Sequence, residues 1–206
     1  MSVVLIFLNE ERFIEEAIQS VVDQSLTDWE LILVDDGSSD RSTQIAKVFV
    51  ARDQRIRYLD HPGHQNHGMA ASRNFGVAHS TGRYLTFLDG DDVWVPTKLA
   101  ENVDLLERIP DVAMVNGAIR LWHSWDPSAV KDDSVVLTGE CADVRLEPPE
   151  AALRTRPLAS ASPAGVDLMV RRTVFDEVGG FEQAFRAMFE DQTLLLKVFI
   201  RYPVFI

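Results

Sequence analysis

Two acidic clusters, each directly following a short apolar run, constrain this chain more than any other feature. The run 31–34 (LILV) leads into 35–38 (DDGS), and the run 84–88 (YLTFL) leads into 89–92 (DGDD). Both runs are continuously apolar rather than alternating, which is typical of parallel strands that are buried on both faces. Open α/β sheets bind ligands at the carboxyl ends of their strands. Both clusters are therefore predicted to face one ligand crevice.

Strand and helix patterns alternate through the first half of the chain. We expect strands at 3–8, 29–34, 56–59, 84–89 and 112–115, and helices at 13–22, around 45–49, 69–79 and 96–106. Asn9 is the expected N-cap of the first helix, with Glu10 and Glu11 in its first turn. This element order predicts an α/β fold with parallel strands and right-handed crossovers.

The second half is less regular. Residues from about 118 to 165 mix Trp, Pro and charged residues with weak periodicity, so we expect an elaborated region over the sheet. Order returns with a predicted strand at 165–170, a short helix at 172–178 and a helix at 191–201. The final residues, 202–206 (YPVFI), read as the start of a strand, and we expect the chain to be cut from a longer one.

Charge and cysteine content narrow the class of protein. The formal net charge of −12 argues against nonspecific binding to nucleic acid or to anionic membranes. The single cysteine, Cys141, excludes an internal disulfide and fits a reducing compartment. No stretch approaches the roughly 20 apolar residues of a membrane span, and residues 2–8 lack the basic leader of a secretory signal. We therefore expect a cytoplasmic protein without a nucleic-acid partner.

The second acidic cluster has the composition of a divalent-cation site. Asp89 and Asp91 can share a hard cation such as Mg²⁺ or Mn²⁺, and the small Gly90 between them lets a ligand approach the backbone. The open positions on such a cation suit phosphate oxygens. A solvated turn has the same composition, so the segment alone leaves both interpretations open.

The first cluster suggests contact with a nucleoside. A buried aspartate at this edge, Asp35 or Asp36, can accept a hydrogen bond from a base N–H or a ribose hydroxyl. Asp, Gly and Ser are also favoured turn formers, which is the alternative. Because the two clusters share an edge, we favour a metal-dependent site for a phosphorylated ligand.

The chain also resembles family 2 glycosyltransferases, which have the GT-A fold. The similar segments follow the family's order: 2–9 (SVVLIFLN), 17–21 (AIQSV), 24–25 (QS), 29–38 (WELILVDDGS), 68–74 (GMAASRN), 82–92 (GRYLTFLDGDD), 96–99 (PTKL), 171–172 (RR), 175–181 (FDEVGGF) and 189–191 (FED). Such a series is far more specific than any one motif. It implies a GT-A type, Rossmann-like three-layer fold with a mainly parallel central sheet.

The resemblance implies an inverting transferase that moves a sugar from a nucleotide diphosphate donor, with UDP favoured, to an acceptor hydroxyl. Asp36 would then meet the base, with Asp35 supporting that pocket. Asp89 would lie near the ribose and the metal, and Asp91 would ligate Mn²⁺ or Mg²⁺. Arg73 would approach the nucleotide or the diphosphate.

Further roles follow from the same resemblance. Asp191 matches the position of the catalytic base, with Glu190 beside it, although acidic residues also open helices for structural reasons. Phe7 and Asn9 fall in the donor-binding segment. Many relatives have an aromatic residue near position 8 that can stack on the base, whereas this chain has Leu8.

The resemblance also implies partners and a division of labour. Within a single domain, residues 1–116 would bind the nucleotide sugar and residues 117–206 a saccharide or lipid-linked acceptor, in glycan or cell-surface polysaccharide synthesis. Peripheral association with the inner face of a membrane is compatible with such an acceptor. Trp122 and Trp125 are candidates to stack on the acceptor sugar, with ordinary packing as the alternative.

Two other functional classes remain open. A metal-dependent nucleotidyltransferase would also combine an α/β sheet with acidic metal ligands, but the chain lacks a glycine-rich, basic triphosphate loop. A non-catalytic nucleotide-sugar-binding module would bind the donor without turnover. The histidines His61, His64 and His67 do not follow a usual zinc-ligand spacing, so we expect a polar loop near the donor.

Overall fold

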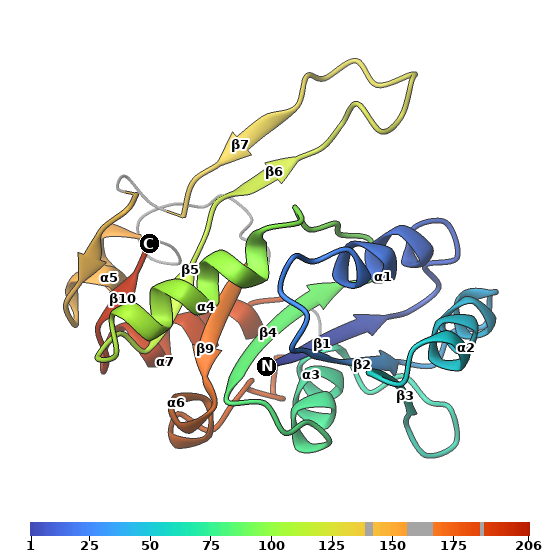
Figure 1. Cartoon of the computed structure of the whole chain (residues 1–206), viewed down its shortest axis with the longest axis horizontal. Coiled ribbons are helices and arrows are strands. Elements are labelled where there is room, and N and C mark those ends of the chain that lie inside the picture. Colours follow the sequence, from blue (N-terminus) through green and yellow to red (C-terminus); the bar gives the residue numbers. More distant parts are fainter. Residues whose placement is uncertain (139–141, 156–166, 186–187) are drawn as a thin grey trace.

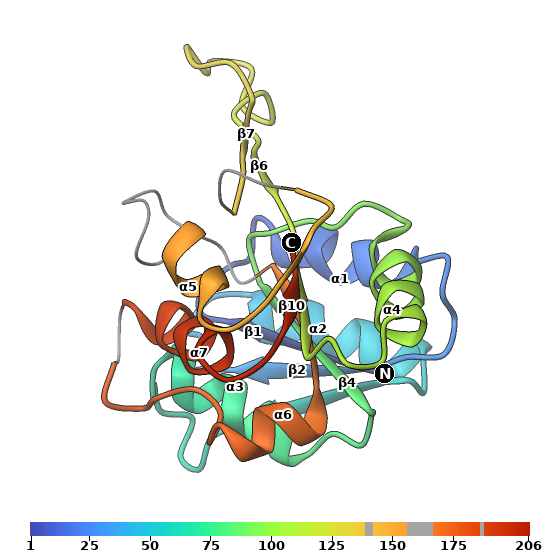
Figure 2. The same cartoon turned by 90° about the vertical axis from the view of Figure 1, so that its left-hand side faces the viewer.

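The computed structural model describes residues 1–138, 142–155, 167–185 and 188–206. It has three layers, a central sheet with helices on both faces (Figures 1 and 2). Eight strands form this sheet in the order β3-β2-β1-β4-β9-β5-β10-β8. Cys141 lies outside the described residues. The predicted α/β fold with a mainly parallel central sheet is confirmed.

The first half follows the predicted alternation, with element boundaries that differ from the prediction by a few residues. Its elements are β1 (Ser2–Phe7), α1 (Ile14–Val22), β2 (Glu30–Asp35), α2 (Ser42–Arg52), β3 (Ile56–Asp60), α3 (Met69–Ala78), β4 (Tyr84–Asp89), α4 (Lys98–Arg108) and β5 (Met114–Asn116).

The second half adds strands to the same sheet, together with a separate hairpin. Its elements are β6 (Ile119–Leu121), β7 (Ser134–Val136), β8 (Arg145–Leu146), α5 (Glu150–Arg154), β9 (Leu168–Arg171), α6 (Arg172–Glu177), α7 (Glu190–Phe199) and β10 (Val204–Phe205). The β6–β7 hairpin projects from the body of the molecule (Figures 1 and 2). None of the helices in the described part of the chain is long and apolar enough to cross a membrane.

Antiparallel pairing enters the sheet in the second half of the chain, at β9 and between β8 and β10. β1 pairs in parallel with β2 and with β4, as expected. β9, however, lies antiparallel between β4 and β5. An apolar run predicts burial but not direction, because direction depends on the connection that precedes the strand. Between β5 and β9, the described residues contain the β6–β7 hairpin, β8 and α5 rather than a single crossover helix.

The role predicted for Asn9 as the N-cap of α1 is wrong. The helix begins at Ile14, and Phe13 occupies the cap position. Asn9 has a left-handed backbone with φ of 59°, a conformation that asparagine tolerates better than most residues. Its side-chain oxygen instead accepts hydrogen bonds from the backbone N–H groups of Ser39 and Asp40. Asn9 therefore ties the loop after β1 to the loop after β2.

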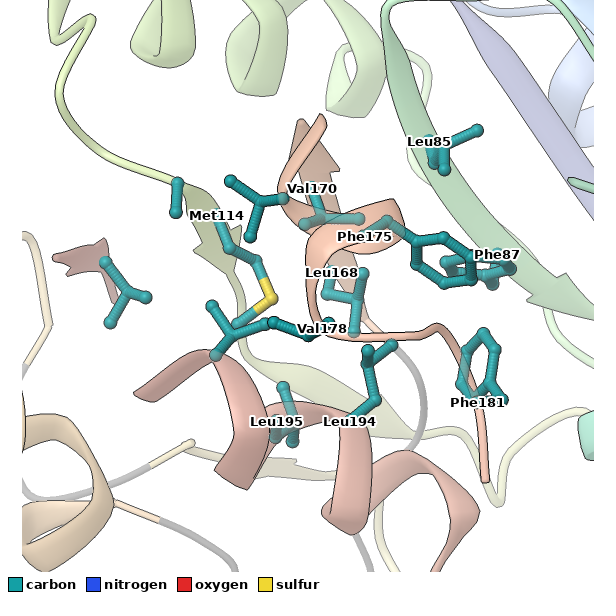
Figure 3. Packing of buried hydrophobic residues seen from close by; sticks show 14 of the residues in the cluster. Leu85, Phe87, Met114, Leu168, Val170, Phe175, Val178, Phe181, Leu194 and Leu195 are labelled. Carbon is teal, nitrogen blue, oxygen red and sulfur yellow. The ribbon is translucent and has the colours of Figure 1, made fainter. Parts of the chain in front are cut away.

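Each face of the sheet buries its own hydrophobic cluster. Successive side chains of β1 point to opposite faces of the sheet. Val3, Leu5 and Phe7 belong to the first cluster, which includes residues of α1, α2 and α4. Val4 and Ile6 belong to the second cluster, which includes residues of α3, α6 and α7. In the second cluster, the Phe181 ring lies edge-on to Phe87 with centroids 4.8 Å apart (Figure 3). This packing fixes α7 and the segment before it against the sheet.

Candidate active site

The two acidic clusters lie at the same edge of the sheet. β1 separates β2 from β4, and its last residues stand in register with both acidic strand ends. Phe7 pairs with Asp35, and Ile6 pairs with Asp89. The prediction that both clusters face one edge is therefore confirmed.

Asp35 is buried and its carboxylate is fully engaged by its own chain. Its Oδ1 accepts the Ser38 N–H at 2.8 Å, and its Oδ2 accepts the hydroxyls of Thr43 and Tyr58. Burial, followed by the charge of Asp35, raises the pKa of Tyr58. These bonds fix the turn 35–38 at the end of β2.

Asp36 is also buried and organises the loop before α3. One carboxylate oxygen accepts the His67 N–H at 2.7 Å and the Ser72 hydroxyl at 3.0 Å, and the other accepts the Gly68 N–H at 3.0 Å. The Asp36 N–H donates to the carbonyl of Phe7. Asp36 therefore connects the ends of β1 and β2 to the start of α3.

Phe7 and Asn9 lie beside these clusters. The Phe7 side chain is 3% exposed and belongs to the hydrophobic core, so its backbone carbonyl is the part that meets the acidic edge. The Asn9 N–H donates to Ser38 Oγ at 3.1 Å. Leu8, between them, is partly exposed at the carboxyl end of β1.

The DGD turn concentrates negative charge. Desolvation, followed by the charges of Asp89, Asp91 and Asp167, raises the pKa of Asp92 to about 7. Desolvation and the charge of Asp91, with smaller contributions from Asp40 and Asp89, raise the pKa of Glu10 to about 6. The pKa of Asp91 is raised by desolvation and by Asp89. Burial, and after it the neighbouring negative charges, thus disfavours the ionised forms of Asp91 and Asp92.

Gly90 is required at this turn by close packing. A Cβ at this position would lie 2.8 Å from Phe7 Cβ and 3.2 Å from Glu10 Cγ. Any larger residue would push the turn away from the end of β1. The backbone between Asp89 and Asp91 therefore lies directly against the neighbouring loop.

The donor set of the DGD turn fits a hard divalent cation. Within the described residues, no three His, Cys, Asp or Glu side chains come together as a ready-made metal cage. Mg²⁺ typically uses one or two carboxylates and fills its other positions with water and substrate phosphates, so a cage is not required. Carboxylates whose pKa values are raised by burial and by neighbouring negative charge are the groups that a cation would stabilise.

Arg73 links the DGD turn to α7. Its side chain is 1% exposed, and its two terminal nitrogens donate to Asp89 Oδ1 and Glu190 Oε1, each at 2.7 Å. Burial lowers the pKa of Arg73, but the two carboxylates outweigh it and raise the pKa. The guanidinium is therefore charged and enclosed by carboxylates.

Asp191 follows Glu190 at the N-terminus of α7. Desolvation, partly offset by the Gln192 N–H, raises the pKa of the Asp191 carboxyl, and the charge of Glu190 adds to the rise. Phe189 before them has a left-handed backbone with φ of 74° and a half-exposed side chain. Strained backbone of this kind is concentrated at functional sites.

Sequence reasoning missed two charged residues at this edge. Asp167 forms an ion pair with the largely buried Lys98 and is one of the charges that raise the Asp92 pKa. Lys98 falls in segment 96–99 (PTKL), and the resemblance of this segment to the family could have identified it. Asp167 falls inside the strand predicted at 165–170, and its position directly before β9 leaves it at the edge of the sheet.

The histidine candidates lie beside the first acidic cluster, whereas the tryptophan candidates lie in the β6–β7 hairpin. The His61 ring stacks on His67 and Phe75 with centroids 4.4 Å and 4.8 Å away, and its Nε2 lies 2.8 Å from Ser72 Oγ. Trp122 and Trp125 are partly exposed in the loop of the projecting hairpin. The histidines therefore belong to the loop that Asp36 organises.

The fold and its acidic edge define the class of protein. *S. aureus* TarS residues 1–349 align with a TM-score of 0.72 at 20% identity, over 98% of this chain and 55% of that chain. The mannosyltransferase PcManGT from *Pyrobaculum calidifontis*, solved in complex with GDP-Man and Mn²⁺, gives a TM-score of 0.67 at 18% identity, over 99% and 53%. The chain has the GT-A glycosyltransferase fold.

The family model described as Glycosyl transferase family 2 matches residues 2–179. The chain belongs to glycosyltransferase family 2. EpsJ of *Bacillus subtilis*, an uncharacterized glycosyltransferase, is 45% identical over 93 residues, covering 45% of this chain and 26% of EpsJ. WfgD of *Escherichia coli*, a UDP-Glc:α-D-GlcNAc-diphosphoundecaprenol β-1,3-glucosyltransferase, is 34% identical over 106 residues, covering 52% of this chain and 40% of WfgD. The chain thus spans well under half the length of these curated relatives.

Proposed function

We infer that this chain transfers a sugar, with inversion, from a nucleotide diphosphate sugar to an acceptor hydroxyl in the synthesis of a cell-surface polysaccharide. The observation that carries this function is the meeting of both acidic clusters at the end of β1, linked through Arg73 to the helix that begins with Glu190. Family membership supports the reaction class.

In this proposal, Asp91 and Asp89 hold Mn²⁺ or Mg²⁺ against the donor diphosphate. When bound, the cation would stabilise the negative charge of the leaving nucleotide. The raised pKa values of Asp91 and Asp92, due to burial and neighbouring charges, and the Mn²⁺ in the PcManGT complex support the assignment. Gly90 keeps the turn packed against Phe7 and Glu10, which holds the two aspartates at the end of β4.

Asp35 and Asp36 are proposed to form the nucleoside side of the site, flanked by Phe7 and Asn9. The loop that carries His67 and Gly68 already bonds to Asp36, so donor binding would rearrange or extend these bonds. UDP is the favoured nucleotide, because TarS has been solved with UDP-GlcNAc and WfgD is named for UDP-Glc. PcManGT was solved with GDP-Man, so the base needs a direct test.

Asp191 is the proposed base. A single displacement at the anomeric carbon inverts its configuration and requires a carboxylate that accepts the proton of the attacking hydroxyl. The raised pKa of Asp191 brings its carboxyl closer to the working range of a general base. Asp191 stands at the start of α7, next to the residue that Arg73 holds.

The acceptor is proposed to be a saccharide, either free or lipid-linked, which would bring the protein to the inner face of the membrane. WfgD, named for a diphosphoundecaprenol acceptor, supports the lipid-linked form. The partly exposed Trp122 and Trp125 remain candidates for contact with this acceptor.

The test is a thermal-shift panel of UDP, GDP, CDP and ADP with and without Mn²⁺, followed by a transfer assay with the nucleotide that stabilises the chain. We expect UDP to raise the melting temperature only in the presence of Mn²⁺. No metal-dependent stabilisation by any nucleotide would contradict the proposal. Binding without transfer across a panel of acceptors would favour the non-catalytic module.

A further inference from the structure

Two neighbouring residues of α3 reach the segment that carries the proposed base. Arg73 donates to Asp89 and to Glu190. Asn74 Nδ2 donates to the Phe181 carbonyl at 2.8 Å, and its Oδ1 accepts the Phe181 N–H at 3.0 Å. One helix therefore fixes the end of β4, the chain before α7 and the first residue of α7.

Arg73 is enclosed by these contacts. Its side chain is almost fully buried, and the Phe181 ring centroid lies 5.3 Å from its guanidinium carbon. Its Nε has no hydrogen-bond partner among the described residues and is shielded from solvent. To contact a diphosphate, the guanidinium would have to leave a carboxylate buried without its counter-charge.

Glu190 is equally inaccessible. It is 3% exposed, its Oε1 accepts from Arg73, and its Oε2 is buried without a partner among the described residues. Asp191, the next residue, is less buried. The geometry therefore separates two neighbouring carboxylates: Glu190 is bound to Arg73 and anchors the helix, whereas Asp191 is more accessible and makes no ion pair among the described residues.

The backbone around this joint is strained or accessible only to glycine. Gly180 has φ of 63°, and a Cβ there would lie 2.8 Å from Asn74 Oδ1. Phe189 has the left-handed backbone described above, which a bulky residue adopts only when its surroundings enforce it. Asn74 contacts Phe181, directly after Gly180, and Arg73 contacts Glu190, directly after Phe189.

We propose that Arg73, Asn74 and Glu190 form a positioning joint that holds Asp191 at a fixed place relative to the DGD turn. The inference rests on the proposed function, because it takes Asp191 as the base. Arg73 and Glu190 are then positioning residues, and neither contacts the donor or the acceptor. The joint couples the metal end of the site to the proton-accepting end.

Kinetics test this role in the full chain with UDP-sugar and Mn²⁺. We expect Glu190→Gln and Asn74→Ala each to lower kcat about 10- to 100-fold while the donor KM changes by less than about threefold. The double variant Glu190→Gln, Asp191→Asn should be no slower than Asp191→Asn alone, because the two residues act as one unit. Glu182→Gln, an exposed carboxylate in the segment before α7, is the matched control.

Two kinetic outcomes would contradict the positioning role proposed for Glu190. A tenfold or greater rise in donor KM or nucleotide Kd for Glu190→Gln, with kcat retained, would mean direct donor contact. A further large loss in the double variant would mean that Glu190 acts independently of Asp191.

Hydrogen exchange tests the joint without any activity. In Arg73→Lys, which keeps the charge but loses the two-pronged donor, and in Glu190→Gln, amides of α7 should exchange faster while those of β2 stay unchanged. Unchanged exchange in α7 would overturn the joint. Faster exchange in α7, together with a wild-type chain that transfers no sugar, would support the joint and count against the proposed function alone.

Discussion

Asp89 and Glu190, from opposite halves of the sequence, accept hydrogen bonds from the two terminal nitrogens of one guanidinium, each at 2.7 Å. The cation between them, Arg73, is buried, so each carboxylate depends on it for counter-charge. The end of β4 and the start of α7 are thereby held at a fixed distance from each other. The function proposed for this edge depends on that spacing.

Asp91→Ala should abolish Mn²⁺-dependent binding of UDP. The substitution removes a carboxylate of the DGD turn that we assign to the cation, and we expect affinity to fall about 100-fold or more. Isothermal titration calorimetry with Mn²⁺ measures the effect. Asp104→Ala is the control, because the Asp104 carboxylate is exposed and pairs along α4 with Arg108. Unchanged affinity in Asp91→Ala would remove this residue from the metal site.

Asp191→Asn should keep donor binding and lose transfer. The amide has nearly the same size but cannot accept the acceptor proton, so kcat should fall about 10²- to 10⁴-fold. Single-turnover transfer and nucleotide calorimetry on the same preparation separate the two effects. Full activity in the variant would exclude Asp191 as the base.

Gly76→Ala tests how closely α3 lies on the sheet. A Cβ at this position would lie 2.4 Å from Val4 Cγ1 and 3.1 Å from Val34 Cγ2. In an open helix the change would stabilise by about 0.5–1 kcal/mol, whereas overpacking here should lower the free energy of unfolding by about 1–3 kcal/mol. Urea unfolding gives the sign. A gain in stability would mean that α3 can move away from β1 and β2.

Glu30 lies at the edge of the sheet opposite to the acidic clusters, and it makes the stability of the fold depend on pH. Desolvation opposes ionisation, but hydrogen bonds from Ser2, Thr81 and Arg57 outweigh it and lower the Glu30 pKa to about 2, well below the ordinary value of a glutamate. Because the folded pKa lies below the unfolded one, the contribution is complete above about pH 5 and is lost as pH falls towards 2.

Glu30→Gln should therefore lower the free energy of unfolding at pH 7 by about 1–3 kcal/mol, a range that allows for screening by the solvent around this partly exposed carboxylate. The variant should also lose less stability than the wild type between pH 5 and pH 2. Thermal unfolding across this pH range measures it. Glu16→Gln, on the exposed face of α1, is the control. Parallel pH curves for Glu30→Gln and the wild type would contradict the assignment.

The sequence predicts the acidic edge well for a physical reason. A strand buried on both faces must be continuously apolar, so the first charged residues after it mark the end of the strand, as at Asp35 and Asp89. Neighbouring parallel strands bring those ends to one edge of the sheet, so this part of the prediction needs no information on side-chain geometry. The three-layer fold follows from the same periodicity.

Other features depend on contacts that no local pattern records. The antiparallel direction of β9 is set by its connection, and the pairing of Arg73 with Glu190 arises only when α3 and α7 pack on the same face. Asparagine is a favoured N-cap residue, but the side-chain oxygen of Asn9 accepts a hydrogen bond from Ser39 in the loop after β2 instead. Asp167 acts on the pKa of Asp92 from a position directly before β9, and the distant strand pairing of β9 brings it there.

The antiparallel strand β9 has a consequence for how the chain is made. It pairs with β4 on one side and β5 on the other, yet it is translated long after both. As the nascent chain leaves the ribosome, β1 to β4 can associate early, while the outer edge of β4 stays open until Leu168–Arg171 emerges. Contacts of such long sequence separation form slowly. Fragments that end before β9 would expose that edge to other chains and should aggregate, so the segment that completes the sheet also protects it.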